Sequence, residues 1–258
     1  MFKSILAVVA LALSAQATPD PYVHTMPESL DAYAAETIAG FPARVNKDLI
    51  TREPELLSTV RTMLASDLLM IEHVLPEPAF DRIKTTTFWI ELQGPVVDPG
   101  MSGRGMCYHA SRDWVTGHGL LAEKTGGVEI CRAEDFIDWR RNQPFMTLHE
   151  LAHAYHHMLG TDYAPVADAY EHAKQAGLYD AVMHNTRTEP ERAYAMTNAT
   201  EYFSELTEAY FGLNDFYPFT RVQLEAHDPQ GLASIEAAWN LSAAELDTII
   251  DRTQQEHP

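Results

Sequence analysis

Apolar and polar residues alternate along the first half of the chain with the period of two that is typical of β-strands. Residues 41–45 place an apolar side chain at every second position. The segment 85–92, TTTFWIEL, is rich in β-branched and aromatic residues and is the clearest strand of the chain. Shorter apolar runs predict two further strands, over residues 106–109 and 128–131.

Elsewhere the apolar residues follow helical spacing. Between residues 51 and 75, leucine, valine, isoleucine and methionine recur every three to four positions, and Thr51 is a suitable N-cap. A short helix is also predicted over residues 29–38. Beyond residue 132 nearly every element has the helical period, and the pattern predicts helices over residues 133–141, 144–159, 164–183, 198–211, 232–239 and 243–250.

Together these patterns predict an α+β protein with one domain after its first 17 residues. The strands fall in a lobe of about residues 18–143, and the second lobe, about residues 144–258, is nearly all helix. Hydrophobic residues make up 46% of the 258-residue chain, which is enough for a substantial core. No Gly-, Pro- or Ser-rich linker divides the two lobes, so we expect them to pack as one unit.

The sequence HELAHAYHH, residues 149–157, lies within the helix predicted over 144–159. Successive residues of an α-helix are turned by about 100°, so His149 and His153 project from one face, one turn apart. Two imidazoles at this spacing can bind one zinc ion, and Glu150 can hold a water bound to the same ion and act as general base. Because this short motif also arises by chance, and catalytic zinc usually has three protein ligands, a third ligand is needed.

A second helix, predicted over residues 198–211, carries Glu201, Glu205 and Glu208 on one stripe and aromatic residues on the other. Buried carboxylates are costly unless they have a partner, and a metal with two imidazoles would be one. Glu201 is the candidate third ligand. Glu205 is the candidate acceptor of a hydrogen bond from the second ring nitrogen of His149.

Two alternatives to this interpretation stay open. Residues 198–201 also fit a capping box, in which Glu201 would bond back to the start of its own helix. The acidic stripe could instead face solvent, and this is the simplest expectation for Glu208. Separately, Tyr194 precedes this helix and could reach across to the site; the alternative for it is a plain surface or core tyrosine.

The paired motifs resemble those of the gluzincin metallopeptidases, and within that group most closely the catalytic domain of the anthrax lethal factor. The resemblance covers roughly residues 144–212 and consists of His149-Glu150-x-x-His153 with Tyr194-x-x-Thr197-Asn198-x-x-Glu201-Tyr202-Phe203-x-Glu205. It implies Zn²⁺ as cofactor and a zincin-like fold, in which a small twisted sheet lies over the active-site helix.

The resemblance also implies a role for each site residue. His149, His153 and Glu201 would bind the metal, Glu150 would be the base, and Glu205 would support the ligands. Tyr194 would donate a hydrogen bond to the oxyanion that forms when a peptide carbonyl is attacked, which also makes chemical sense unaided. Val128 to Ile130 is the candidate edge strand for pairing with an extended substrate.

The charge of the chain narrows its possible partners. Acidic residues number 37 against 18 basic ones, for a formal net charge of −19. This balance argues against binding to nucleic acid or to an anionic membrane surface, which require a basic face. Residues 1–17 have a positive start at Lys3, a short apolar run and an Ala-Gln-Ala end, and they predict a signal peptide and secretion.

Cys107 and Cys131 are the only two cysteines. In a secreted chain an even pair predicts one disulfide, here between two strands. The alternative is two free buried thiols, and neither cysteine has the paired spacing of a structural zinc site.

The sequence therefore predicts a secreted zinc metalloendopeptidase that hydrolyses peptide bonds. The competing hypothesis is a secreted binding protein whose zinc site is not catalytic. A base such as Glu150 would be unnecessary in such a protein, which favours the enzyme.

Overall fold

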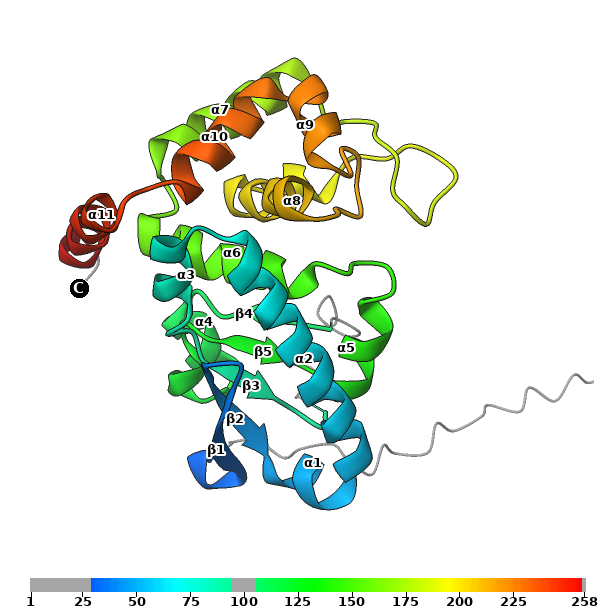
Figure 1. Ribbon diagram of the computed structural model, residues 1–258, viewed down its shortest axis with the longest axis vertical. Helices are drawn as coiled ribbons and strands as arrows, with labels where there is room; N and C mark the ends of the chain where they lie inside the picture. The colour runs from blue at the N-terminus through cyan, green and yellow to red at the C-terminus, as the bar shows by residue number, and fades with distance from the viewer. Residues whose placement is uncertain (1–28, 94–104, 257–258) are drawn as a thin grey trace, which may run out of the picture.

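The computed structural model describes residues 29–93 and 105–256. Within these ranges the chain forms a five-stranded sheet in its first half and a set of helices that continues through its second half (Figure 1). This confirms the α+β prediction. The predicted signal peptide, residues 1–17, lies outside the described residues.

The sheet has the strand order β1-β2-β3-β5-β4. β2, β3 and β5 are parallel, whereas β1 and β4 each run antiparallel to their one neighbour. β5 is therefore internal and β4 is the edge strand beyond it, so the expectation that residues 128–130 form an edge was wrong. The strand bounds are β1 Tyr33–Ile38, β2 Phe41–Asn46, β3 Phe88–Ile90, β4 Cys107–Tyr108 and β5 Val128–Ile130.

The helices follow the predicted pattern over most of the chain. The long helix predicted from an N-cap at Thr51 starts instead at Pro54, which has no amide hydrogen to donate, and Thr51 belongs to a separate short helix over residues 47–52. Short helices over residues 47–52, 77–83, 112–117 and 221–227 were not predicted, and the helix predicted over residues 164–183 ends at residue 176. The bounds are α1 Lys47–Arg52, α2 Pro54–Val74, α3 Glu77–Ile83, α4 Arg112–Gly117, α5 Ala133–Trp139, α6 Met146–Leu159, α7 Ala164–Ala176, α8 Ala199–Phe211, α9 Arg221–His227, α10 Pro229–Trp239 and α11 Ala243–Glu256, with 3₁₀ turns at Leu30–Ala32, Ala122–Lys124 and Tyr194–Met196.

The helix predicted over residues 29–38 is wrong, because most of this segment is strand β1. The two residues that join β1 to β2 explain the difference. Ala39 and Gly40 both have positive φ, of 46° and 88°, which is the backbone of a tight hairpin turn. The turn pairs β1 with β2 over their full length, and this pairing outweighs the weak helical pattern.

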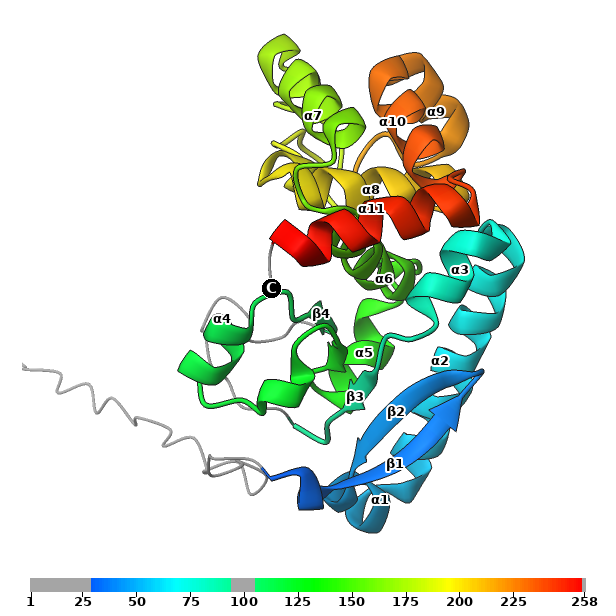
Figure 2. The same ribbon diagram turned by 90° about the vertical axis from the view of Figure 1, so that its left-hand side faces the viewer.

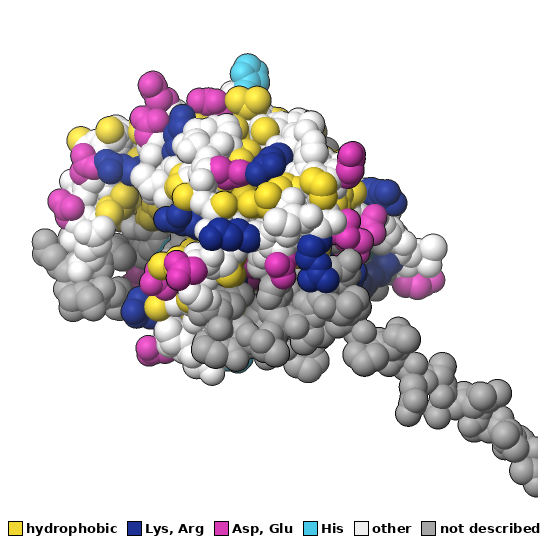
Figure 3. Space-filling model, turned by 90° about the horizontal axis from the view of Figure 1, so that it is seen from below, with side chains coloured by type: hydrophobic (Ala, Val, Ile, Leu, Met, Phe, Trp, Pro, Cys, Tyr) yellow, Lys and Arg dark blue, Asp and Glu magenta, His cyan; other side chains and the backbone are white. Residues whose placement is uncertain are grey.

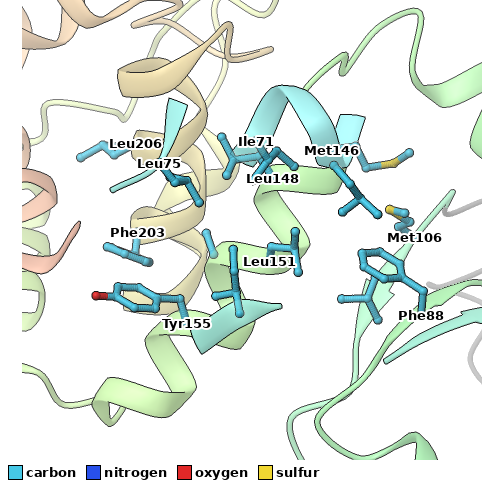
Figure 4. Packing of buried hydrophobic residues seen from close by; sticks show 14 of the residues in the cluster. Ile71, Leu75, Phe88, Met106, Met146, Leu148, Leu151, Tyr155, Phe203 and Leu206 are labelled. Atoms are coloured by element: carbon cyan, nitrogen blue, oxygen red, sulfur yellow. The ribbon is translucent and has the colours of Figure 1, made fainter. Parts of the chain in front are cut away.

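The two faces of the sheet differ in polarity because side chains alternate along each strand. Phe88, Ile90, Val128 and Ile130 lie on one face and belong to the main hydrophobic core. Figure 4 shows Phe88 in this core together with residues of α2 and α6, among them Ile71, Met146 and Leu151. This apolar face holds the sheet against α6.

The opposite face carries a buried network of charged groups. Lys124 donates from Nζ to Glu91 and to Glu129, each at 2.9 Å, and all three side chains are buried. His109 donates from Nε2 to the second oxygen of Glu129 at 2.5 Å. Burial would raise the pKa of Glu129, but the Lys124 ammonium and the bond from His109 lower it to about 2. The ionised carboxylate is thus stabilised by its partners.

The helical lobe packs on the other side of α6. α8 lies along α6, and α7, α9 and α10 lie beyond it (Figure 1). Trp239 stacks on Tyr155 at a ring distance of 4.2 Å and also contacts Phe203, which joins α10, α6 and α8. α11 then crosses back over α6 and reaches α3 (Figure 2). Helix α6 is therefore enclosed between the sheet and the helical lobe.

No helix in the described part of the chain is long and apolar enough to cross a membrane. The face seen in Figure 3 carries basic and acidic side chains close together, with apolar side chains between them. Neither sign of charge forms a continuous area on the part of this face that is coloured.

The predicted disulfide is not formed in the structure. Cys107 and Cys131 are free thiols with their sulfur atoms 3.3 Å apart, which is a contact distance and not a bond. The prediction was right to place Cys107 on a strand, but Cys131 lies just outside one. Cys107 is in β4, and Cys131 directly follows β5.

Candidate metal centre

Helix α6 holds His149 and His153 beside the centre of the molecule. Its first turn is fixed to α2, where Asp67 accepts a hydrogen bond from Thr147 at 2.8 Å and also binds Arg140. The helix ends at Gly160, whose φ of 89° is unfavourable for other residues. His149 and His153 lie between these two ends on the side that faces α8.

Helix α8 supplies the third candidate ligand, and its cap decides between two roles for Glu201. Asn198 is the N-cap and accepts hydrogen bonds from the backbone N–H groups of Thr200 and Glu201, each at 2.9 Å. The Glu201 side chain points to the histidines and not back to the cap, since its Oε2 is 3.1 Å from Nε2 of both His149 and His153. Glu201 is therefore available as a ligand.

The three candidate ligand atoms form a nearly equilateral triangle. Nε2 of His149 and Nε2 of His153 are 3.1 Å apart, and each is 3.1 Å from Oε2 of Glu201. The centre of such a triangle is about 1.8 Å from each corner, so an ion slightly above its plane would lie at the Zn–N and Zn–O distances of about 2.0–2.2 Å. The donor set and its spacing fit a zinc ion.

Glu208, and not Glu205, accepts the hydrogen bond from the second nitrogen of His149. Nδ1 of His149 is 2.7 Å from Oε1 of Glu208 but 3.9 Å from Glu205. Gln143 donates to the same Glu208 oxygen at 2.9 Å. Glu208 is fully buried, so the expectation that it faces solvent was wrong. Its bond leaves the Nε2 lone pair of His149 directed at the other two ligand atoms.

The charges of the site are closely coupled. Burial opposes a charge on His149, yet its hydrogen bonds with Glu201 and Glu208 raise its pKa well above the usual value. Burial likewise opposes the charge on Glu201, but the two imidazoles lower its pKa well below the usual range. Burial, with Asp215 and Glu208 nearby, raises the pKa of Glu205. The site thus favours an ionised Glu201 carboxylate beside a positively charged His149 ring.

Glu150 lies beside the triangle and is held by the edge strand. Its Oε2 accepts a hydrogen bond from the backbone N–H of Tyr108 in β4 at 2.8 Å. The Tyr108 hydroxyl forms a second bond to α6, 2.7 Å from Nδ1 of His157. Strand β4 therefore both borders the site and orients the candidate base.

Tyr194 approaches the triangle from the 3₁₀ turn before α8. Its hydroxyl donates to Oε1 of Glu201 at 3.1 Å, while the other oxygen of Glu201 faces the histidines. The tyrosine is thus part of the site and not a remote surface residue.

A cavity of about 920 Å³ opens onto these groups. Its wall includes the three corners of the triangle together with Glu150, Tyr194 and Glu205. Apolar side chains from three segments, Met106, Trp139 and Met146, form another part of the wall. The cavity is large enough for several residues of a peptide, and it brings the candidate base and the tyrosine to one space.

Two contributions to the site could not be read from the sequence motifs. The only sequence signal for the role of Glu208 was its position on the same helical stripe as Glu201, which precedes it by seven residues. The backbone N–H of Tyr108 had no signal, because any residue type would supply it. Such a contact depends on how the strand is placed over the helix.

Comparisons of the chain with protein-family models, with curated proteins and with solved structures found no match. The function must therefore be argued from the residues of the site and their geometry.

Proposed function

We propose that the protein is a secreted zinc metalloendopeptidase of the gluzincin type, with a zincin-like fold. The observation that carries the proposal is the triangle of His149, His153 and Glu201 with 3.1 Å sides, together with Glu150 beside it. The secreted location is inferred from the pattern of residues 1–17 alone.

The zinc ion, when bound by His149, His153 and Glu201, would polarise a substrate carbonyl and lower the pKa of a water. Glu150 takes the proton of the attacking water and is oriented for this by the N–H of Tyr108. Glu208 keeps the His149 ring in the tautomer that presents Nε2 to the ligand triangle. Glu150 and His149 are thus each held in position by a hydrogen bond with another group of the site.

Tyr194 serves as hydrogen-bond donor to the negative oxygen that forms on the substrate. Its hydroxyl, which donates to Glu201 in this structure, would turn to the substrate oxygen as charge develops there. A donor fixed at this position stabilises the transition state more than the bound substrate.

An extended peptide substrate would lie along strand β4, the edge strand among the described residues. Pairing with an exposed edge places the substrate backbone in register by its own hydrogen bonds. The N–H of Tyr108 connects this strand to Glu150, so the same strand that holds the peptide would also hold the base. This replaces residues 128–130, which are internal, as the substrate strand.

The test is metal analysis of the purified full chain, followed by hydrolysis of casein or a mixed peptide library. We expect zinc with the protein, peptide cleavage, loss of cleavage with a chelator and its return when zinc is added. The double variant His149→Ala with His153→Ala should lack cleavage under all these conditions. A zinc-loaded chain that cleaves nothing would support the alternative of a binding protein.

A further inference from the structure

We propose that the chain has a second zinc site, formed by Cys107, Cys131, His109 and Glu129 on the face of the sheet that is turned away from α6. It shares no residue with the ligand triangle, although Cys107 and His109 line the same cavity. It would bind a divalent cation that accepts sulfur, nitrogen and oxygen ligands, of which zinc is the most suitable.

The strand register places the four side chains together. β4 and β5 are antiparallel, with Cys107 directly opposite Glu129. His109 follows Cys107 by two residues and Cys131 follows Glu129 by two. Cys107 and Glu129 are cross-strand partners and so share one face of the sheet, and the contacts of Cys107 Sγ with His109 and Cys131 place those two side chains beside them. The pattern is therefore Cys-x-His on one segment and Glu-x-Cys on its neighbour.

The distances agree with a shared ligand set. Cys107 Sγ is 3.3 Å from Cys131 Sγ and 3.7 Å from Nε2 of His109. The ligand atoms of Cys107, His109 and Glu129 all lie within 4.8 Å of one another. Ligand atoms around tetrahedral zinc lie about 3.3–3.8 Å apart, given Zn–N and Zn–S lengths of about 2.0–2.3 Å. The sulfur contacts already have this spacing.

A hydrogen bond joins two of the atoms that would bind the metal ion. Nε2 of His109 donates to Oε2 of Glu129 at 2.5 Å. A metal ion could replace the proton of this hydrogen bond. Nε2 of His109 and Oε2 of Glu129 would then move apart by about 1 Å to reach the spacing of tetrahedral ligands. Lys124 binds the other oxygen of Glu129, Oε1, and so does not occupy the position of the ion.

Burial and charge also fit such a site. Cys107, His109 and Glu129 are each less than 7% exposed, which is unusual for this combination of residues unless they share a partner. Cys131 is half-buried, and Cys107 and His109 border the large cavity, so an ion can enter. Glu91 already neutralises Lys124. Two thiolates and Glu129 would then supply the negative charge for the cation.

The proposal also explains two thiols that are in contact but not bonded. If the chain is secreted, as proposed above, cysteines this close would be expected to form a disulfide unless another ligand holds the sulfur atoms. A zinc ion would keep both as thiolates and protect them from oxidation.

The experiment uses the full chain carrying His149→Ala and His153→Ala, so that the triangle cannot bind metal. Titration with Co²⁺ under reducing conditions should give one bound ion with the near-ultraviolet absorption of a cobalt–thiolate bond. Cys107→Ser and His109→Ala, added singly to this background, should each abolish or strongly weaken that absorption. His73→Ala, which changes an exposed histidine of α2, is the matched control and should leave it unchanged.

A second measurement uses the unmutated chain, in case a variant fails to fold. Zinc should slow the alkylation of both cysteines by at least about 10-fold relative to a chelated sample, since thiolates held by zinc are removed from solvent. The proposal is overturned if the background chain shows no cobalt–thiolate absorption and zinc leaves alkylation unchanged. It is also overturned if protein purified with zinc contains the Cys107–Cys131 disulfide. Because the titration does not use the triangle or peptide cleavage, its result is independent of the proposed peptidase activity.

Discussion

The two candidate metal sites of this protein are built from different kinds of secondary structure. In the first, all three ligands come from helices α6 and α8; the spacing of His149 and His153 on one helix indicates two of them, and the acidic stripe of α8 suggests the third. In the second, the ligands come from β4, β5 and the residues that follow these strands, and each strand contributes only a pair two residues apart.

The difference shows why one kind of site is easy to recognise and the other is not. A helix brings residues four apart into contact by its own geometry, so the sequence contains the site. A strand brings residues two apart to one face, and every strand does so. Only the pairing of β4 with β5 makes Cys107, His109 and Glu129 neighbours. Four predictions sharpen this comparison.

The largest effect is expected at the base of the helical site. Glu150→Gln should lower peptide turnover by about 10²–10⁴-fold, the usual contribution of a general base. Zinc content should stay unchanged, because Glu150 is not a corner of the ligand triangle. The measurement is kcat on a metal-quantified variant, with Glu225→Gln on the exposed side of α9 as control. Full activity in the Glu150 variant would refute the mechanism.

Tyr194→Phe should reduce kcat by about 10²–10³-fold while KM changes little, since the lost hydrogen bond acts mainly in the transition state. The assay is done at saturating zinc, because the hydroxyl also donates to Glu201. Tyr163→Phe, outside the cavity wall, is the matched control and should retain activity. An unchanged kcat would leave Tyr194 with a purely structural role.

His156 is a buried histidine of α6 that belongs to neither metal site, and it should limit stability in acid. Neither ring nitrogen has a hydrogen-bond partner among the described residues, and burial, with His153 and His157 nearby, lowers its pKa to about 4. The unfolded chain takes up this proton near pH 6.5, whereas the folded chain does so only near pH 4. Stability is therefore lost as the pH falls between these values, by about 3 kcal/mol in total.

The test of this prediction is urea unfolding between pH 7 and pH 4. His156→Leu should lose less stability over this range than the unmutated chain. His172→Leu, on the exposed side of α7, should behave like the unmutated chain. Equal pH dependence in all three proteins would mean that His156 is not the group that titrates.

The smallest effect is expected for Glu208, whose carboxylate accepts the hydrogen bond from His149. Glu208→Ala should weaken zinc binding by about 10–100-fold, as for other residues that orient a ligand. Glu205→Ala should weaken it less, since Glu205 is 3.9 Å from His149, and Glu201→Ala should weaken it most. Competition with a chelating dye gives the three affinities. A larger loss of zinc affinity in Glu205→Ala than in Glu208→Ala would instead support the sequence-based prediction that Glu205 orients His149.

The strand and helix pattern of the chain was largely predictable, and its errors have local causes. Strands over residues 41–45, 106–109 and 128–131 were confirmed, as were the helices that carry the candidate ligands. The helix predicted over residues 29–38 was wrong, because the turn at Ala39 and Gly40 pairs the segment with β2. The predicted disulfide was wrong because a pattern that places two cysteines on neighbouring segments does not determine whether their sulfur atoms bond.

The sequence by itself determined the features that depend on one element at a time. His149, Glu150 and His153 lie in register on one helix, and the acidic stripe of the second helix follows from the same 3.6-residue period. Asn198 caps that second helix through a contact with residues two and three positions later. These relations are local, so they are contained in spacing.

Only the tertiary structure decided which groups meet across elements. It gave the hydrogen bond of His149 to Glu208, it placed the N–H of Tyr108 on Glu150, and it made β4 the edge of the sheet. Each of these contacts joins residues more than 40 positions apart or depends on strand order, and several residue types could have supplied it. The physical reason is that packing of the sheet against α6, and of α6 against α8, sets these distances, and no spacing within a single element encodes them.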